Sequence, residues 1–189
     1  MDNVLADFNA GFEKVYSQLY GNKIRISLEH YDVLHDSGLP QKEKQKIYDT
    51  VFCTPGFWIQ FNPIPNSIEV MEELNQKFDL FICSKPTNKG DMNCTREKLL
   101  WLDSHFPFLC PTKQVIFMSE KHLLDGNNRI LIDDSVDHLE KWSKGVAIKF
   151  FQPYNQDFMD ADFDVADWLE IGSLLLDNYE FSTVKEATN

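Results

Sequence analysis

The chain has 189 residues, with 18 Lys and Arg against 30 Asp and Glu, and a formal net charge of −12. This length favours one domain with a small appendage, and a hydrophobic content of 43% excludes a disordered chain. The negative charge excludes polymeric DNA or RNA as a partner, because affinity for a phosphate backbone comes mainly from Lys and Arg.

The N-terminal third of the chain has helical patterns. An amphipathic helix is predicted over 11–20 by the spacing of its apolar residues, Phe12, Val15, Tyr16 and Leu19. The stretch 22–61 mixes charged and apolar residues between Gly- and Pro-containing breaks, which predicts helices joined by turns. A Pro- and Asn-rich segment follows, and we expect Asn66 or Ser67 to cap a helix over 68–78.

Beyond residue 80, short apolar runs alternate with helical or loop segments. Buried strands are predicted at 80–83, 115–118, 130–132 and 146–148. Helices are predicted over 97–105, 137–142 and 165–176, and a polar tail over 182–189. Strands that alternate with helices imply a parallel sheet in a doubly wound α/β fold.

The sequence also suggests where the protein resides. No apolar run approaches the roughly 18 residues that a membrane helix needs, and the first residues do not resemble a secretory signal. The cysteines are too far apart for close-spaced zinc pairs: Cys53, Cys83, Cys94 and Cys110. We therefore expect a cytoplasmic protein with reduced thiols and no membrane partner.

Polar residues follow the predicted strands, at the edge where open parallel sheets bind ligands. Asp133 and Asp134 end the third run, and two adjacent carboxylates there are costly unless a cation such as a divalent metal compensates them. Ser84 and Lys85 end the first run and supply a hydroxyl and an ammonium group suited to phosphate oxygens. Asp2 precedes the first predicted helix, which would place it near an anion-binding N-terminus.

Each candidate, taken alone, also fits an ordinary structural role. Adjacent Asp133 and Asp134 are typical of a turn that caps a helix, and Ser84 with Lys85 is typical of a strand exit. In the same way, Asp2 is typical of an acid that precedes a helix, and Lys98 of a lysine on a solvated helix face. The aromatic candidates are typical of core residues: Phe8, Phe57 and Trp58.

Together and in this order, the motifs resemble the haloacid dehalogenase superfamily of phosphohydrolases and, within it, the 5'(3')-deoxyribonucleotidases. The opening residues Met1-Asp2-Asn3-Val4-Leu5-Ala6-Asp7-Phe8 are close to the family's Asp-Met-Asp-Gly-Val-Leu-Ala-Asp-Phe. Further similar stretches follow in the family's order: 55–58, 63–65, 81–86, 97–98 with Trp101, and 131–134. The resemblance spans nearly the whole chain, from Met1 to about Lys149.

The resemblance implies a Rossmann-like parallel sheet of the haloacid dehalogenase type with a small helical cap. The α/β core would comprise 1–12 and 63–189, and the cap 13–62. Phe8, Phe57 and Trp58 would line the pocket under the cap and stack on a nucleobase.

The resemblance also implies a phosphoaspartyl mechanism with Mg²⁺. Asp2 matches the acid/base that protonates the leaving alkoxide and then activates water. Ser84 matches the hydroxyl that binds a phosphoryl oxygen, and Lys98 matches the lysine that neutralises the nucleophile and phosphate. Asp134, and less directly Asp133, match the metal-binding motif, and the metal would also take the backbone carbonyl of Asp2.

The chain departs from the family pattern at several positions. The family's nucleophilic Asp would immediately precede Met1, together with the apolar first core strand, which is missing from this chain. Omitting a central strand would expose unpaired edges on both neighbours, so we expect that the sequence starts at an internal Met. Asn3 replaces a Gly, Lys85 a second hydroxyl and Ser135 an Arg; Lys85 and Lys121 are the candidates for the missing positive charge.

The favoured function is Mg²⁺-dependent hydrolysis of deoxyribonucleoside monophosphates. Two alternatives stay open: a phosphatase of the same superfamily for another small phosphate ester, and a catalytically dead nucleotide-binding protein. The expected partner is a small nucleoside monophosphate, and a homodimer is compatible with the sequence.

Overall fold

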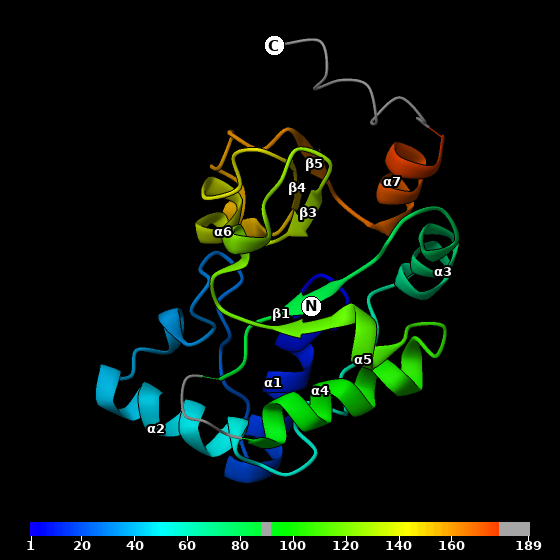
Figure 1. Ribbon diagram of the computed structural model, residues 1–189. Coiled ribbons are helices and arrows are strands. Elements are labelled where there is room, and N and C mark those ends of the chain that lie inside the picture. Colours follow the sequence, from blue (N-terminus) through cyan, green and yellow to red (C-terminus); the bar gives the residue numbers. More distant parts are fainter. Residues whose placement is uncertain (88–91, 178–189) are drawn as a thin grey trace.

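The computed structural model describes residues 1–87 and 92–177 of the chain (Figure 1). Its α-helices are α1 (Phe8–Tyr20), α2 (Gln41–Phe52), α3 (Ser67–Lys77), α4 (Met92–His105), α5 (Pro111–Gln114), α6 (Val136–Glu140) and α7 (Trp168–Gly172). Its strands are β1 (Ile82–Ser84), β2 (Val115–Phe117), β3 (Ile130–Asp133), β4 (Val146–Phe150) and β5 (Phe163–Val165). Short 3₁₀ turns are η1 (His35–Ser37), η2 (Lys121–Leu124) and η3 (Pro153–Asn155), and a π-helical turn, η4 (Ser173–Asp177), follows α7.

All strand pairs are parallel, so the α/β prediction is confirmed. β1 pairs with β2, with Ile82 opposite Val115, and β3 pairs with β4, with Ile130 opposite Val146. The four predicted strands are present with ends shifted by one or two residues. The sequence pattern missed β5, whose central Asp164 interrupts its apolar residues.

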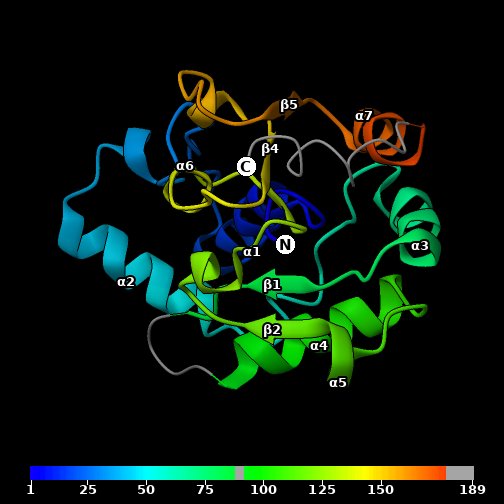
Figure 2. The same ribbon diagram turned by 45° about the horizontal axis from the view of Figure 1, so that its top comes forward.

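The described strands form two sheets instead of the single predicted sheet. One sheet has the order β1-β2 and the other has the order β3-β4-β5. The N-terminal segment, residues 1–6, lies between β1 and the β3–β4 pair (Figure 2). This segment is a turn whose only ladder contacts are single bridges from Ala6 to Asp2 and Pro63. The carboxyl ends of β1 and β3 therefore face the same N-terminal turn.

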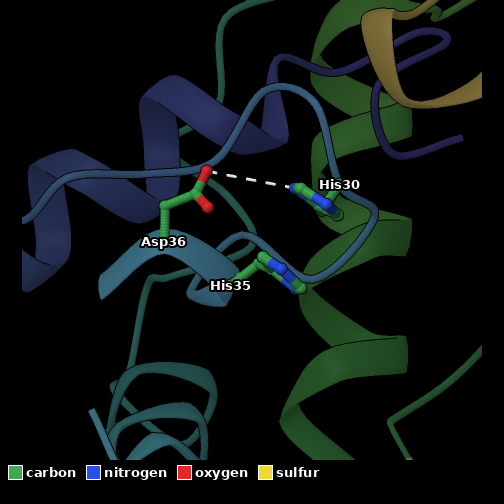
Figure 3. Close-up of side chains that lie close together, drawn as sticks. All are labelled: His30, His35 and Asp36. Atoms are coloured by element: carbon green, nitrogen blue, oxygen red, sulfur yellow. Dashed lines mark ion pairs between the residues drawn. The ribbon is translucent and has the colours of Figure 1, made fainter. Parts of the chain in front are cut away.

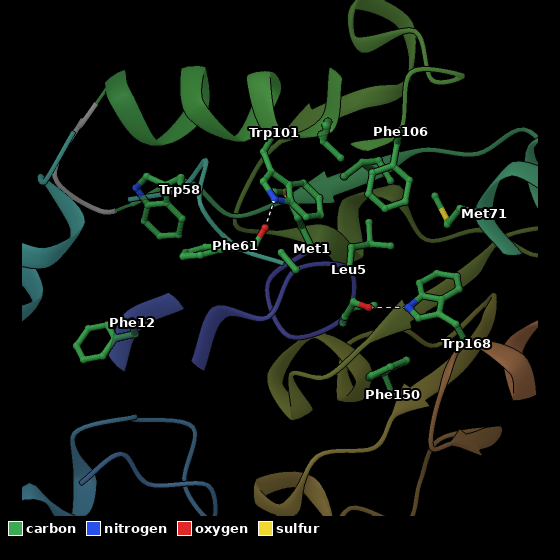
Figure 4. Packing of buried hydrophobic residues seen from close by; sticks show 14 of the residues in the cluster. Met1, Leu5, Phe12, Trp58, Phe61, Met71, Trp101, Phe106, Phe150 and Trp168 are labelled. Atoms are coloured by element: carbon green, nitrogen blue, oxygen red, sulfur yellow. Dashed lines mark hydrogen bonds between the residues drawn. The ribbon is translucent and has the colours of Figure 1, made fainter. Parts of the chain in front are cut away.

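The core is built around this turn (Figure 4). Met1, Leu5 and Ala6 are buried. The indole N–H of Trp168 donates to the carbonyl of Val4 at 2.7 Å, and Trp101 similarly anchors the carbonyl of residue 61 at 2.8 Å. A buried carbonyl needs such a donor, so the two tryptophans fix the backbone on both sides of the site.

Helix α1 begins three residues before the predicted start. Asp7 is its N-cap, and the Asp7 side chain accepts a hydrogen bond from the backbone N–H of Ala10 at 3.0 Å. Asp7 therefore caps α1 and Asp2 belongs to the preceding turn, so the expectation that Asp2 lies near this helix N-terminus stays a prediction. Gly11 lies so close to Phe61 that a Cβ would come within 2.1 Å of its ring, which is why α1 packs tightly here.

The helices beyond α1 lie near their predicted positions but differ from the prediction in their capping and length. Asn66, one of the two expected candidates, is the N-cap residue of α3, although its side chain makes no capping hydrogen bond. The predicted closing helix is split into α7 and η4, and α7 packs on α3 (Figure 1). The predicted cap boundary between residues 12 and 13 falls inside α1, and the division into core and cap stays a prediction. The predicted tail, 182–189, lies outside the described residues.

Two further expectations concern the chain as a whole. All four cysteines lie within the described residues and are free thiols. Within residues 1–87 and 92–177, no helix combines the length and apolar character required to cross a bilayer.

Candidate active site

Three of the predicted site residues meet through one ammonium group. Lys98, on α4, is 1% exposed and donates to Oδ2 of Asp2 at 2.6 Å and to the hydroxyl of Ser84 at 3.0 Å. The backbone carbonyl of Lys85 lies 3.3 Å from the same nitrogen. Asp2 is 96 positions and Ser84 is 14 positions from Lys98 in sequence, so the fold assembles the cluster. It presents a cation, a hydroxyl and a carboxylate to one place.

The turn at the N-terminus aims Asp2 at Lys98. The carbonyl of Met1 accepts hydrogen bonds from the backbone N–H groups of Leu5 and Ala6 at 2.8 and 3.1 Å. Asn3 has a φ of 52°, a left-handed conformation that Asn tolerates better than most residues. Asn3 therefore keeps the turn tight at the position where the resembling family has Gly.

Asp133, at the end of β3, is held as a carboxylate. It pairs with the buried ammonium of Lys121 at 2.6 Å and accepts from the backbone N–H of Ser135 at 3.0 Å. Burial alone would raise the pKa of Asp133, but Lys121, the Met1 amino group and the Ser135 N–H together outweigh it, and the pKa lies below its usual value. Lys121, one of the predicted substrate-binding residues, is thus already committed to Asp133.

The pKa of Asp134 is shifted in the opposite direction. Burial, followed by the neighbouring Asp133 charge, raises the pKa of Asp134 to about 7. Its carboxylate accepts a short hydrogen bond from the hydroxyl of Tyr154, and its backbone carbonyl accepts from the side-chain amide of Asn155 at 2.9 Å. A buried carboxyl with a raised pKa beside a second carboxylate is a place where a bound cation would favour the charged form.

The Lys98 cluster with Asp2 and the carboxylate pair of Asp133 and Asp134 lie on either side of the amino nitrogen of Met1. Burial and then Lys121 lower the pKa of this amino group, while the charges of Asp2, Asp133 and Asp134 act in the opposite sense. In addition, Oδ1 of Asp2 is buried and has no hydrogen-bond partner in the described part of the chain. Carboxylate and carbonyl oxygens are the ligands that Mg²⁺ prefers, so Asp134 and the backbone carbonyl of Asp2 fit a Mg²⁺ site.

The aromatic candidates form one cluster beside Lys98. Phe8 packs on both Phe57 and Trp58, with ring centroids 6.1 Å apart in each case, and the Lys98 ammonium lies 4.5 Å from the Trp58 ring centre. Glu97, buried next to Lys98 in sequence, accepts the backbone N–H groups of Gly56 and Trp58 at 2.7 and 3.1 Å. The 97–98 pair therefore ties the aromatic cluster to the phosphate-type groups.

The exposure of these rings differs from the predicted lining role. Phe57 is 0% and Trp58 3% exposed, while Phe8 is half-buried. In this structure Phe57 is a packing residue beneath Phe8, which was the ordinary interpretation of its sequence. The indole N–H of Trp58 is buried without a hydrogen-bond partner among the described residues. Base stacking by these residues stays a prediction, as does phosphate binding by the exposed Lys85 side chain.

Sequence reasoning missed Tyr154, Asn155 and Tyr31. Tyr154 and Asn155 lie in η3, and Tyr31 reaches the same place from the segment between α1 and α2, with its ring edge-on to Tyr154 at 5.6 Å. Polar residues in a short Pro-containing turn carry no periodic signal that would single them out. Their position after β4, at the same edge as Asp134, was the available clue.

One family profile and several known proteins similar to this chain carry related names. The sequence profile of the family described as "5' nucleotidase, deoxy (Pyrimidine), cytosolic type C protein" matches residues 1–180. A relative in Bordetella pertussis, assigned by name to the 5'(3')-deoxyribonucleotidases, is 27% identical over 176 residues, which cover 90% of this chain and 91% of the relative. The cytosolic-type 5'(3')-deoxyribonucleotidase of Homo sapiens is 29% identical over 141 residues, covering 71% and 67% of the two chains. That of Bacillus subtilis is 32% identical over 115 residues, covering 61% and 63%.

Proposed function

The chain belongs to the 5'(3')-deoxyribonucleotidase family, a group of phosphoric monoester hydrolases, and from this premise we propose that it serves Mg²⁺-dependent hydrolysis of deoxyribonucleoside monophosphates in the cytoplasm. The observation that carries the proposal is the Lys98 ammonium, which lies within hydrogen-bonding distance of both Asp2 and Ser84. Asp134 follows the end of β3, which faces the same N-terminal turn. A bound phosphate needs hydrogen-bond donors such as the Lys98 ammonium and the Ser84 hydroxyl, and its cation needs an acceptor such as the Asp134 carboxylate.

Each residue has a distinct role in the proposed reaction. The hydroxyl of Ser84 and the ammonium of Lys98 bind phosphoryl oxygens and orient the ester. Asp134 and the Asp2 backbone carbonyl would hold Mg²⁺, which supplies charge neutralisation for the phosphate when bound. Asp133 is engaged by Lys121 and acts behind Asp134, by setting the local charge. Tyr154 and Asn155 position Asp134.

The nucleophile is proposed to be an Asp joined directly to the amino end of Met1. Its carboxylate would attack phosphorus, the ester P–O bond would break, and the protonated Asp2 would give its proton to the leaving alkoxide. Asp2 would then take a proton from water, whose oxygen attacks phosphorus and releases phosphate from the aspartyl group.

The aromatic cluster supports a nucleotide over a smaller ester. Stacking of a base on Phe8 contributes about 1–3 kcal/mol, which a sugar phosphate lacks. An apolar wall beside the ribose would leave a 2'-hydroxyl unpaired, at a cost of about 1–3 kcal/mol. We therefore expect deoxyribonucleotides to be preferred over ribonucleotides, and pyrimidines over purines under a small cap.

The test is a comparison of three proteins: the 189-residue chain, the chain extended before Met1 by an apolar segment ending in Asp, and the same extension ending in Asn. Only the Asp-ending protein should turn over, and its kcat/KM should fall from deoxyribonucleotide to ribonucleotide to sugar phosphate. Ordinary turnover by the 189-residue chain would refute the assigned roles. Equal use of the sugar phosphate would favour another phosphatase, and nucleotide binding without turnover by any protein would favour a binding protein.

The metal assignment has its own test in the extended protein. Asp134→Asn should weaken Mg²⁺ binding strongly and abolish turnover, because it removes a direct ligand. Asp133→Asn should weaken binding less, because its carboxylate is already paired with Lys121. Calorimetric titration of both variants measures the difference, and equal losses would refute the distinction between the two carboxylates.

A further inference from the structure

A second cluster of metal-binding side chains lies outside the candidate active site. His30, His35 and Asp36 project from the segment between α1 and α2 (Figure 3). Their ligand atoms, one imidazole nitrogen from each histidine and one carboxylate oxygen, all lie within 4.8 Å of one another. Nδ1 of His30 is 3.9 Å from Oδ2 of Asp36. All three residues are exposed, so water can complete a coordination shell.

The backbone beneath the cluster is held by hydrogen bonds. Ser27 N–H donates to the carbonyl of Val33 at 2.8 Å, which closes the segment on itself. The Lys44 ammonium donates to the carbonyl of His35 at 3.2 Å. Ser37 bonds through its hydroxyl to the carbonyl of Leu34 at 2.6 Å. A site on a braced backbone loses less entropy when an ion binds.

A buried hydroxyl joins two of the three ligands from behind. Ser27 is 2% exposed, and its hydroxyl lies 3.1 Å from Nδ1 of His30. The same side chain also interacts with the carboxylate of Asp36. Hydrogen bonds to ligating groups orient them and are a regular feature of metal sites.

The two imidazole rings are stacked, with centroids 3.5 Å apart and an interplanar angle of 7°. Neutral imidazole nitrogens with one carboxylate are a donor set that suits Zn²⁺ and its neighbours in the first transition row, whereas Mg²⁺ prefers oxygen alone.

We propose that His30, His35 and Asp36 form a Zn²⁺ site on the segment between α1 and α2, separate from the carboxylate site proposed for Mg²⁺. The segment also carries Tyr31, whose ring packs on Tyr154 beside Asp134. The two sites are therefore connected through one stretch of backbone, but they share no ligand.

The test is calorimetric titration of the 189-residue chain with Zn²⁺ in the presence of excess Mg²⁺, repeated for His30→Gln and His35→Gln. Each variant should bind Zn²⁺ at least about 10-fold more weakly, because loss of even an outer partner of a ligand costs about 10–100-fold. His122→Gln is the matched control, because His122 is a surface histidine that also faces a carboxylate, that of Glu120 at 3.4 Å.

Asp134→Asn distinguishes the two sites. This variant and the control should bind Zn²⁺ as the parent chain does, and Co²⁺ added in place of Zn²⁺ should give visible absorption bands that His30→Gln abolishes. If the histidine variants bind Zn²⁺ as tightly as the parent chain, or if Asp134→Asn removes the binding instead, the site is refuted.

Discussion

Lys98 allows a quantitative test of how the candidate site is held together. Its ammonium is 1% exposed and pairs with Asp2, whose side chain is 32% exposed. Lys98→Met keeps the length of the side chain and removes the charge, which leaves the Asp2 carboxylate without its partner. Breaking a fully buried ion pair in this way costs about 3–5 kcal/mol. Since water reaches part of Asp2, we expect about 2–3 kcal/mol.

The double variant Asp2→Asn/Lys98→Met separates the charge effect from the loss of packing. It removes the uncompensated carboxylate, so it should be more stable than Lys98→Met alone by about 1 kcal/mol. The free energy of unfolding of the parent, both single variants and the double variant, from urea denaturation at neutral pH, gives the coupling energy. High salt should change this coupling little, because buried pairs are weakly screened.

The matched control is the exposed ion pair between Asp137 in α6 and Lys141 at the C-terminal end of α6, whose charged atoms are 2.8 Å apart. The corresponding cycle with Asp137→Asn and Lys141→Met should give a smaller coupling that salt removes. The reasoning is refuted if the Asp2 and Lys98 substitutions are additive, or if the double variant is less stable than Lys98→Met.

Two further predictions concern the loop before β4. Asp125 accepts backbone N–H bonds from residues 143–145 at 2.8 Å each, and these outweigh burial and lower its pKa. The charged Asp125 therefore stabilises the folded chain at neutral pH, and this contribution is lost as the pH falls through the lowered pKa. Asp125→Asn should lower the free energy of unfolding by about 1 kcal/mol at neutral pH and by progressively less in acid. A loss of stability that grows in acid would contradict this. Gly145→Ala should destabilise by about 3 kcal/mol or more, because its Cβ would lie 2.3 Å from the carbonyl of residue 129. Gly126→Ala meets its nearest neighbour at 3.5 Å and should change little, and thermal unfolding compares the two.

The α/β class, the predicted strands and the motif residues at their ends were predictable because they depend on local patterns. Runs such as 130–132 are apolar over a length typical of buried strands, and Asp133 and Asp134 interrupt that pattern where the strand ends. The opening residues 1–8, followed in order by the motifs that contain Ser84, Lys98 and Asp134, were specific enough to predict the family, which the profile match over residues 1–180 confirmed.

The tertiary structure decided which of these groups touch and in what state. Asp2 meets Lys98 across 96 positions, and Tyr154 meets Asp134 across 20, and no local pattern encodes such pairs. Adjacent Asp133 and Asp134 look equivalent in the sequence, yet within residues 1–87 and 92–177 only Asp133 forms an ion pair with a lysine, and their pKa values move in opposite directions. Local periodicity sets which residues enter helices and strands, whereas burial and charge partners are set by segments that become neighbours only when the chain packs.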